Sequence, residues 1–398
     1  MSQYQITLDA AQLQCLFQND GLKPLLEQVL NQVLQAQVSE AIGAQPHERS
    51  EERTAYRNGY RERDLTARIG TLTLRVPKLR SGTFTPDLFE RYQRSELALL
   101  ACLVEMVIQG VSTRKVSAVV EELCGESVSK SSVSALCQQL DPHVSAWRNR
   151  DLSQTAYPFV IVDALVIRVR ENGRVRPKSL LVACGVNADG YREILGFALG
   201  DKESEASWSA FFQSLKQRGL TGVDLVVSDS HGGLVSAVHT HFQQAQWQRC
   251  QTHLSRNVLD VCPKSEHDAL HKALRRVFEA DTPHEARQEL TTLLAAFAAR
   301  APKSCDCLEA AFDEATAVLT LPLPYRRRLR TTNSQERLNE EIRRRERVIR
   351  IFPNEPSVER LLGALLMEFD EAFSTNQRYF DMTEYHVYKQ QQQQQKAA

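Results

Sequence analysis

The chain has 398 residues, 42% of them hydrophobic, which is long enough for two or three domains with separate cores. Its 49 basic and 49 acidic side chains balance, so net charge alone favours no class of partner. Nine irregularly spaced cysteines and an N-terminus without an apolar signal segment argue against a secreted disulfide framework, and no stretch is apolar enough for a membrane helix. We therefore expect a soluble, reduced protein of the cytoplasm.

Residues 1 to 150 predict a mainly helical region that includes a small basic β element. Leu and Val recur at three- and four-residue steps within residues 6 to 44, which indicates a helix that ends near Gly43. Residues 67 to 84 then alternate apolar and polar side chains, which is typical of a strand. Residues 53 to 80 carry eight basic and two acidic side chains. This block favours contact with a polyanion or, equally well, an ordinary solvated face.

Residues 113 to 140 have the pattern of two short helices separated by a tight turn. The first run, TRKVSAVVEELCG, ends at a glycine, and Ser131 or Ser132 is a suitable N-cap for the second. Such a pair suits a DNA-binding helix-turn-helix, but helical bundles contain it equally often.

From Tyr157 the sequence predicts a mixed α/β domain. The stretches YPFVIVDALVIRVR, KSLLVACGVN and REILGFALG are three strand-like runs at hairpin-like spacing. A helix follows over residues 205 to 220, then a short buried strand, a second helix, and the start of a further strand at WQRCQTHL. This β-β-β-α-β-α order predicts an α/β fold with a mixed sheet.

The rest of the chain is predicted to be helical up to a polar tail. Between residues 266 and 320 the apolar side chains recur with helical period, and Thr282 followed by Pro283 and Glu285 has the pattern of a capped helix start. Residues 326 to 350 contain ten arginines and four glutamates. The glutamine run at the end predicts disorder over residues 386 to 398.

Two aspartates are the first candidates for chemistry. Asp163 interrupts an apolar strand, where a carboxylate is costly unless it is paired or binds a metal. Asp229 ends a second apolar run before a glycine-containing turn, a common position for a ligand site. On adjacent strands the two would repel, and a hard divalent cation such as Mg²⁺ would relieve that repulsion. Taken singly, either aspartate fits a turn or a structural salt bridge better.

A third carboxylate is expected from the arginine-rich segment. Glu336 is the first candidate, although it also fits a capping box that begins at Asn333. Helical phase does not distinguish Glu336 from Glu340 or Glu341 as a site residue.

Cys250 and His253 form a C-x-x-H pair. With Cys305 and Cys307 they could complete a zinc site, but a packed thiol beside a hydrogen-bonded histidine fits the spacing better. The sequence contains neither the phosphate-binding pattern of nucleotide hydrolases nor the nucleophile elbow of serine hydrolases.

Five ordered blocks resemble the Mutator-type bacterial insertion-sequence transposases. They are YRNGYRERDLTARIGTLTLRVPKLRSGTF, VDALVIRVRENGRV, VVSDSHGGLVSAV, WQRCQTHLSRNVL and RTTNSQERLNEEIRRRERVIRIFPN. The resemblance covers roughly residues 10 to 380. It implies a ribonuclease H-like catalytic domain with a mixed five-stranded sheet and flanking helices, split into residues 155 to 258 and 326 to 385 by an all-helical insertion at 259 to 325.

The resemblance also implies which residues act. The three acids of a DDE triad fall on Asp163, Asp229 and Glu336, which selects Glu336 over its neighbours, and the family's C-x-x-H signature falls on Cys250 and His253. Two Mg²⁺ or Mn²⁺ ions are the implied cofactors.

The implied activity is binding of an element's terminal inverted repeats, followed by DNA cleavage and strand transfer into target DNA, with at least a homodimer on the DNA. The rival hypotheses are a ribonuclease H-like nuclease that does not join strands and a catalytically dead DNA-binding regulator. The basic residues we expect to contact double-stranded DNA are Arg57, Arg61, Arg63, Arg80, Arg114, Lys115, Arg326, Arg327, Arg328, Arg343, Arg344 and Arg345.

Overall fold

The computed structural model describes residues 22–46, 48, 53–67, 70–80, 84, 86, 102–112, 115–119, 130–375 and 378–397. The chain forms two compact units: residues 1–107 with 111–137, and residues 108–110 with 138–398. No helix within these described ranges has the length and apolar character needed to cross a lipid bilayer.

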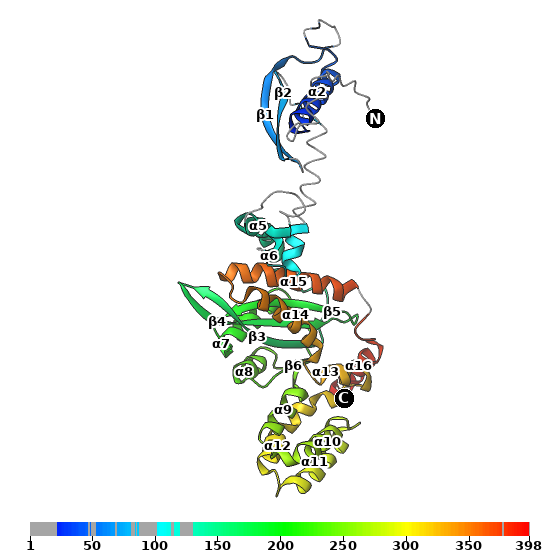
Figure 1. The fold of residues 1–398 in the computed structure, drawn as a ribbon. Coiled ribbons are helices and arrows are strands. Elements are labelled where there is room, and N and C mark those ends of the chain that lie inside the picture. Colours follow the sequence, from blue (N-terminus) through cyan, green and yellow to red (C-terminus); the bar gives the residue numbers. More distant parts are fainter. Residues whose placement is uncertain are drawn as a thin grey trace. The chain divides into compact units, whose positions relative to one another are not determined.

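In the first unit, helix α2 (Leu22–Ile42) lies against a hairpin of the antiparallel strands β1 (Arg57–Ala67) and β2 (Gly70–Leu79) (Figure 1). Leu34 of the helix and Leu74 of β2 are fully buried in the small core between them. The strand predicted from the alternation in residues 67 to 84 is confirmed as β2. Strand β1 has no such alternation in its sequence, because most of its side chains are polar and exposed.

A second small core of this unit joins helical residues 102–107 and 115–119 to helix α5 (Lys130–Cys137). Leu103, Val116 and Val133 are buried in it. The helices expected around residues 113 to 140 are therefore present in part. The turn proposed between them lies outside the described residues, so the helix-turn-helix remains a prediction.

The second unit is built on a five-stranded sheet in the order β5-β4-β3-β6-β7. Strands β3 (Phe159–Glu171), β4 (Arg174–Val186) and β5 (Arg192–Gly200) are antiparallel neighbours. Strands β6 (Leu225–Ser228) and β7 (Gln246–Arg249) are short and run parallel to β3. The predicted mixed α/β sheet is confirmed, and β3 is its central strand.

The two faces of this sheet are covered by different helices. Helices α7 (Glu205–Gln217) and α8 (Gly232–His241) pack on one face, where Val160 and Val162 of β3 are buried against Trp208. Alternate residues of β3 point to the opposite face, since side chains alternate along a strand. Phe159 and Ile161 lie there, beside helix α13 (Leu323–Leu329).

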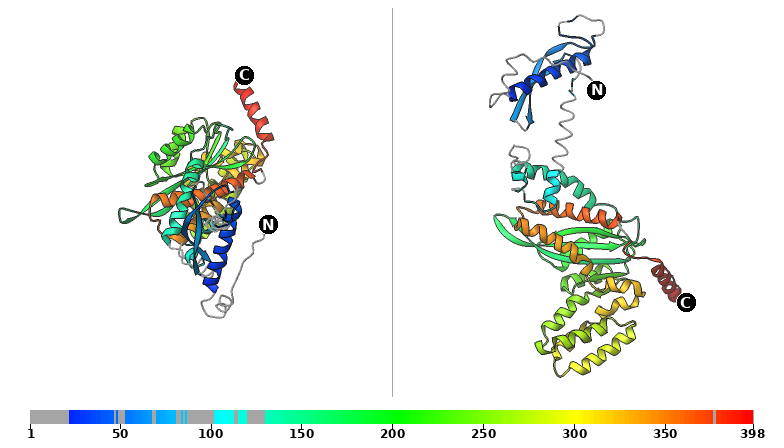
Figure 2. Two further views of the ribbon diagram at one scale, coloured as in Figure 1. Left: turned by 90° about the horizontal axis from the view of Figure 1, so that it is seen from above. Right: turned by 45° about the vertical axis from the view of Figure 1, so that its right-hand side comes forward.

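Helices α14 (Asn333–Ile349) and α15 (Glu355–Thr375) cover the rest of that opposite face, and Figure 2 shows them lying together along the sheet. Helix α6 (Asp141–Arg148) packs outside α15, and Val144 of α6 meets α15 at Gly363, where a Cβ atom would approach it to 2.3 Å. A side chain at position 363 would therefore separate the two helices.

Between β7 and α14 the chain is helical. The helices are α9 (Gln251–Asp260), α10 (His267–Phe278), α11 (Pro283–Phe297) and α12 (Pro302–Thr316), joined by the 3₁₀ turns Lys264–Glu266 and Ala317–Thr320. They share a core of their own, as the sequence period indicated. The predicted capped start is confirmed: Thr282 Oγ1 accepts from the Glu285 N–H at 3.1 Å, and the Glu285 carboxylate accepts from the Thr282 N–H at 3.2 Å.

The C-terminal tail differs from the prediction of disorder. Residues Thr383–Ala397 form helix α16. Tyr385, near the start of this helix, is buried against Phe159 of β3, and Lys389 lies 2.5 Å from the Asp224 carboxylate. Glutamine is a good helix former, so a helix anchored in this way continues through the glutamine run.

Candidate active site

Asp163 lies in β3 on the face covered by α14. Its Oδ1 atom accepts from the Ala164 N–H at 2.9 Å, and its Oδ2 atom accepts from the Asn339 side-chain amide at 2.6 Å. Burial raises the pKa of the Asp163 carboxyl above its ordinary value, against these two hydrogen bonds, which lower it. The negative charge of Asp229 raises this pKa further. Asp163 is thus a partly desolvated carboxylate that lies close enough to Asp229 for electrostatic repulsion between them.

Asp229 follows β6, the parallel neighbour of β3. The strand register pairs Ile161 with Val227, so Asp163 and Asp229 each lie two residues further along adjacent strands. The His231 N–H donates to Asp229 Oδ1 at 3.2 Å and closes the turn that leads into α8. The sheet therefore brings together the two aspartates that the sequence singled out.

Glu336 lies in the first turn of α14, and its side chain is exposed. The capping-box alternative is wrong. The N-cap is Thr332, which makes no side-chain cap bond, and the third helical residue is Gln335. Gln335 instead donates its amide to the Ile161 carbonyl at 2.7 Å and ties the helix to β3.

The three glutamates at the start of α14 differ in their surroundings. Glu336 is exposed and lies one turn before Asn339 on the same helix. Glu341 forms ion pairs with Arg344, at 3.0 Å, and with Arg345. Glu340 is exposed. Across the described part of the chain, no three His, Cys, Asp or Glu side chains lie close enough to hold one metal ion.

Cys250 is buried at the N-cap position of α9, where its sulfur accepts from the Thr332 N–H at 3.4 Å. Burial raises the pKa of this thiol, but the neighbouring His253 side chain and Thr332 outweigh that effect and lower it to about 7. The hydrogen bond to Cys250 raises the pKa of His253, although burial lowers it. The negative charges of Asp229 and Asp163 raise the pKa of His253 further. The pair therefore joins α9 to the start of α14 beside the acids.

The zinc alternative for this pair is not supported. Cys305 is buried in the separate core of helices α9 to α12, and no metal-holding group of three ligands occurs among the described residues.

A further carboxylate, Glu203, lies near the two aspartates and was not predicted. Its Oε1 atom accepts from the Trp208 indole N–H at 3.1 Å and lies 3.5 Å from His231 Nδ1. Burial raises the pKa of Glu203, and the charges of Asp229 and Asp163 raise it further. No local pattern distinguishes Glu203 from the acids around it, because its role depends on how α7 packs beside α8.

The predicted DNA-contacting residues have varied surroundings. Arg57 donates to Ser39 Oγ at 2.7 Å and to the Ala44 carbonyl, and Arg326 donates to the carbonyls of Leu321 and Asp281. Arg328 donates to the Tyr379 carbonyl and Arg344 pairs with Glu341, whereas Arg343 donates to the Val166 carbonyl. Arg328 and Arg344 are nevertheless exposed, as are Arg61, Arg80, Lys115 and Arg327. Arg63 is partly buried, and Arg114 lies outside the described residues.

Arg345 corrects one of these predictions. Its side chain is only 2% exposed, and its guanidinium donates to the Ile108 carbonyl and to Glu341. Because the guanidinium is enclosed by these partners, it has no surface to offer a phosphate. Arg345 is a structural residue that holds α14 to residues 108 to 110.

The two aspartates lie side by side where the parallel strand β6 ends against β3, and α/β domains of this class bind ligands at the carboxyl ends of their parallel strands. This chain belongs to the Mutator family of transposases, whose sequence profile matches residues 1–376. The resemblance found in the sequence is thereby confirmed.

Individual relatives match over nearly the whole chain. The chain is 45% identical over 388 residues to the transposase for insertion sequence element IS256 in transposon Tn4001 of Staphylococcus aureus, covering 96% of this chain and 99% of the relative. It is 43% identical to the transposase for insertion sequence element ISRM5 of Rhizobium meliloti, covering 96% of both chains. It is 39% identical to the transposase for insertion sequence element IS1081 of Mycobacterium tuberculosis, covering 91% of this chain and 88% of the relative.

Proposed function

We propose that this chain is a DNA transposase that cleaves and joins DNA with Asp163, Asp229 and Glu336 in a ribonuclease H-like domain. The observation that carries the proposal is the placement of Asp163 and Asp229, each two residues beyond the paired Ile161 and Val227, with the Asn339 amide bound to Asp163. The sheet order supports the ribonuclease H-like assignment, because three antiparallel strands are followed by two short parallel ones. The predicted division of the catalytic domain into residues 155 to 258 and 326 to 385 is part of this proposal.

The residues of the site suit a hard divalent cation. Carboxylate oxygens are the ligands that Mg²⁺ and Mn²⁺ prefer, and two neighbouring carboxylates, one of them partly desolvated, are stabilised by a positive ion. Asp163 and Asp229 would hold the ions. Glu336 would join them as the third ligand only after α14 brings it closer, because no three acids among the described residues lie within reach of one ion here. When bound, two such ions supply a water nucleophile and neutralise charge on the phosphodiester.

The chain's own residues would orient the reaction. Asn339 fixes the rotamer of Asp163, and Gln335 holds the first turn of α14, and with it Glu336, over β3. In the first step, water attacks phosphorus and the bond to the 3′-oxygen breaks, which leaves a 3′-hydroxyl and a 5′-phosphate. In the second step, that hydroxyl attacks another phosphodiester and displaces a 3′-oxygen, so no covalent protein–DNA intermediate is needed.

The partners in this proposal are the element's terminal inverted repeats and target DNA, bound as double strands, with the first unit binding the repeats. Joining two ends requires at least two copies of the chain on the DNA. A protein with these partners would work on chromosomal DNA in the bacterial cytoplasm.

The test is cleavage of DNA carrying candidate element ends in the presence of Mg²⁺ or Mn²⁺. We expect Asp163→Asn, Asp229→Asn and Glu336→Gln each to abolish cleavage and to leave DNA binding intact. Glu340→Gln is the matched control, because Glu340 is also exposed and lies one turn further along the same helix. Cleavage that survives Glu336→Gln would refute the assignment of the third acid.

Strand transfer separates the rival functions. Pre-cleaved ends should be joined to a target duplex by the wild-type chain, and cutting without joining would favour a nuclease. Full biological effect of Asp163→Asn in cells would favour a DNA-binding regulator.

A further inference from the structure

A groove of about 910 Å³ runs between the end of the β3–β4 hairpin and the second half of α14. It is separate from the acids and is not assigned by the proposed function. The hairpin contributes Val166, Arg168 and Val175, and the helix and its C-cap contribute Arg343, Arg347 and Arg350.

The groove carries a net positive charge that the protein does not neutralise. Its one carboxylate, Glu346, is already engaged by Arg343 at 2.6 Å. In the regions that the structure describes, no carboxylate lies within ion-pair distance of Arg168, Arg347 or Arg350. Three arginines along one groove, without acidic partners, match a ligand that carries several negative charges along its length.

The groove also has an apolar part, formed by two strand valines that are unusually exposed. Val166 is 53% exposed and Val175 is 43% exposed. Arg170 pairs with Val175 across the hairpin, and Arg168 pairs with Pro177, so apolar and basic side chains share this face. Apolar surface between phosphate-binding arginines is complementary to a nucleic-acid backbone, in which apolar sugar faces separate the phosphates.

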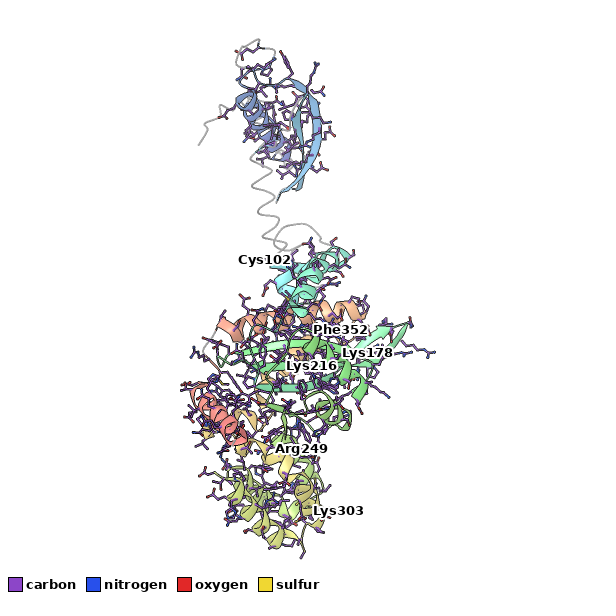
Figure 3. All side chains as sticks on the ribbon, turned by 180° about the vertical axis from the view of Figure 1, so that it is seen from behind. Cys102, Lys178, Lys216, Arg249, Lys303 and Phe352 are labelled. Atoms are coloured by element: carbon purple, nitrogen blue, oxygen red, sulfur yellow. The ribbon has the colours of Figure 1, made fainter. Side chains whose placement is uncertain are left out.

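The hairpin is held in place by the segment that follows α14. Phe352 is 1% exposed, accepts from the Arg170 N–H at 2.8 Å and donates its own N–H to the Arg168 carbonyl at 2.9 Å. Lys178 lies 2.7 Å from Glu355 at the start of α15. Figure 3 labels Lys178 of the hairpin and Phe352, which follows α14. Because these contacts fix the hairpin, the groove is a formed surface in the absence of any ligand.

The groove begins about one helical turn from the residue that binds Asp163. Asn339 binds Asp163, and one turn further along α14 Arg343 donates to the Val166 carbonyl at 2.6 Å. A strand of DNA whose reacting phosphodiester lies at Asp163 would therefore reach the groove within a short distance.

We propose that this groove binds the sugar-phosphate backbone of the duplex DNA that flanks the reacting phosphodiester, through Arg168, Arg347 and Arg350. The proposal rests on the proposed function only for the position of the reacting bond. Recognition here would be independent of base sequence, because the groove offers charge and apolar surface to the backbone alone.

The test is the salt dependence of binding of a duplex with an element end to the full chain. The double variant Arg168→Ala/Arg347→Ala removes two exposed guanidiniums and should reduce the slope of log affinity against log salt by about 2. The control Lys272→Ala/Lys303→Ala removes the same charge from exposed positions of the helical insertion and should leave the slope unchanged. An unchanged slope in the groove variant, or an equal drop in the control, would overturn the proposal. Thermal denaturation verifies that both variants fold.

The location is tested by placing a photo-crosslinking amino acid at Val175. We expect crosslinks to nucleotides beside the cleaved bond, and crosslinks confined to distant nucleotides would contradict the assignment. Asp163→Asn distinguishes this proposal from the proposed function. If that variant still cleaves DNA, the triad fails while the binding result for the groove stands. If it binds but does not cleave, and the groove variant keeps the wild-type salt slope, the groove alone is refuted.

Discussion

The side-chain amide of Asn339 donates a 2.6 Å hydrogen bond to Oδ2 of Asp163 and joins the arginine-rich helix to the central strand. Two residues 176 positions apart in the chain thereby fix the orientation of one candidate catalytic carboxylate. This contact lowers the pKa of Asp163 against the larger effect of burial, which raises it.

Substitution of Asn339 should therefore impair metal-dependent cleavage. In Asn339→Ala the pKa of Asp163 rises further, so the acidic limb of the pH–rate profile should move to higher pH. We expect metal affinity to fall by about 10- to 100-fold, the usual loss when a partner of a metal ligand is removed. The measurement is the cleavage rate against pH and Mg²⁺ concentration, with exposed Glu340→Gln as control. A wild-type pH profile in Asn339→Ala would contradict this role.

Glu203 should strengthen cation binding without being one of the three acids. It lies near enough to Asp163 and Asp229 for their charges to raise its pKa, and its own charge acts on them in return. In Glu203→Gln, whose side chain can still accept from Trp208, we expect the Mg²⁺ concentration needed for half-maximal cleavage to rise about tenfold. Glu205→Gln, exposed two residues away, is the control. Equal Mg²⁺ dependence in both variants would show that Glu203 acts only in packing.

Cys250 should contribute to stability in a pH-dependent way. Its folded pKa is lowered to about 7 from an ordinary value of 9.0, so its contribution is present above pH 9 and is lost as pH falls through about 7. Cys250→Ala should therefore cost about 2 to 3 kcal/mol more above pH 9 than near pH 6. Denaturant unfolding at both pH values provides the measurement.

Cys305→Ala is a control for that experiment, because its effect on stability should change with pH in the opposite direction. Burial raises the pKa of the Cys305 thiol, so its contribution is lost as pH rises, and its substitution should cost less at high pH than at low pH. The same pH trend in both variants would refute the distinction between the two thiols.

Gln335 should matter for stability and for the placement of Glu336. Its side chain is 1% exposed and its amide donates to the Ile161 carbonyl at 2.7 Å. Gln335→Ala leaves a buried carbonyl without its donor and opens a small cavity, at a cost of about 2 kcal/mol in unfolding free energy. Exposed Arg337→Ala should change the unfolding free energy by less than about 0.5 kcal/mol. A loss of cleavage in Gln335→Ala at temperatures where the variant is folded would link this contact to the position of α14.

The sequence by itself determined the local elements and the identity of the family. Alternation in β2 and the helical period of residues 266 to 320 reflect how each segment divides its own side chains between core and solvent. For the same reason Asp163 and Asp229 could be recognised, because each interrupts or ends an apolar run.

Contacts between distant segments were decided only by the tertiary structure. Arg345 has the same sequence surroundings as Arg343 and Arg344, yet it is the one enclosed by Ile108 and Glu341. Glu203 approaches Asp163 and Asp229 only because α7 begins beside the turn that leads into α8. Periodicity shows which side of its own helix or strand a side chain occupies. Which neighbour that side chain contacts depends on how whole elements pack, and the pattern of a single sequence does not contain that information.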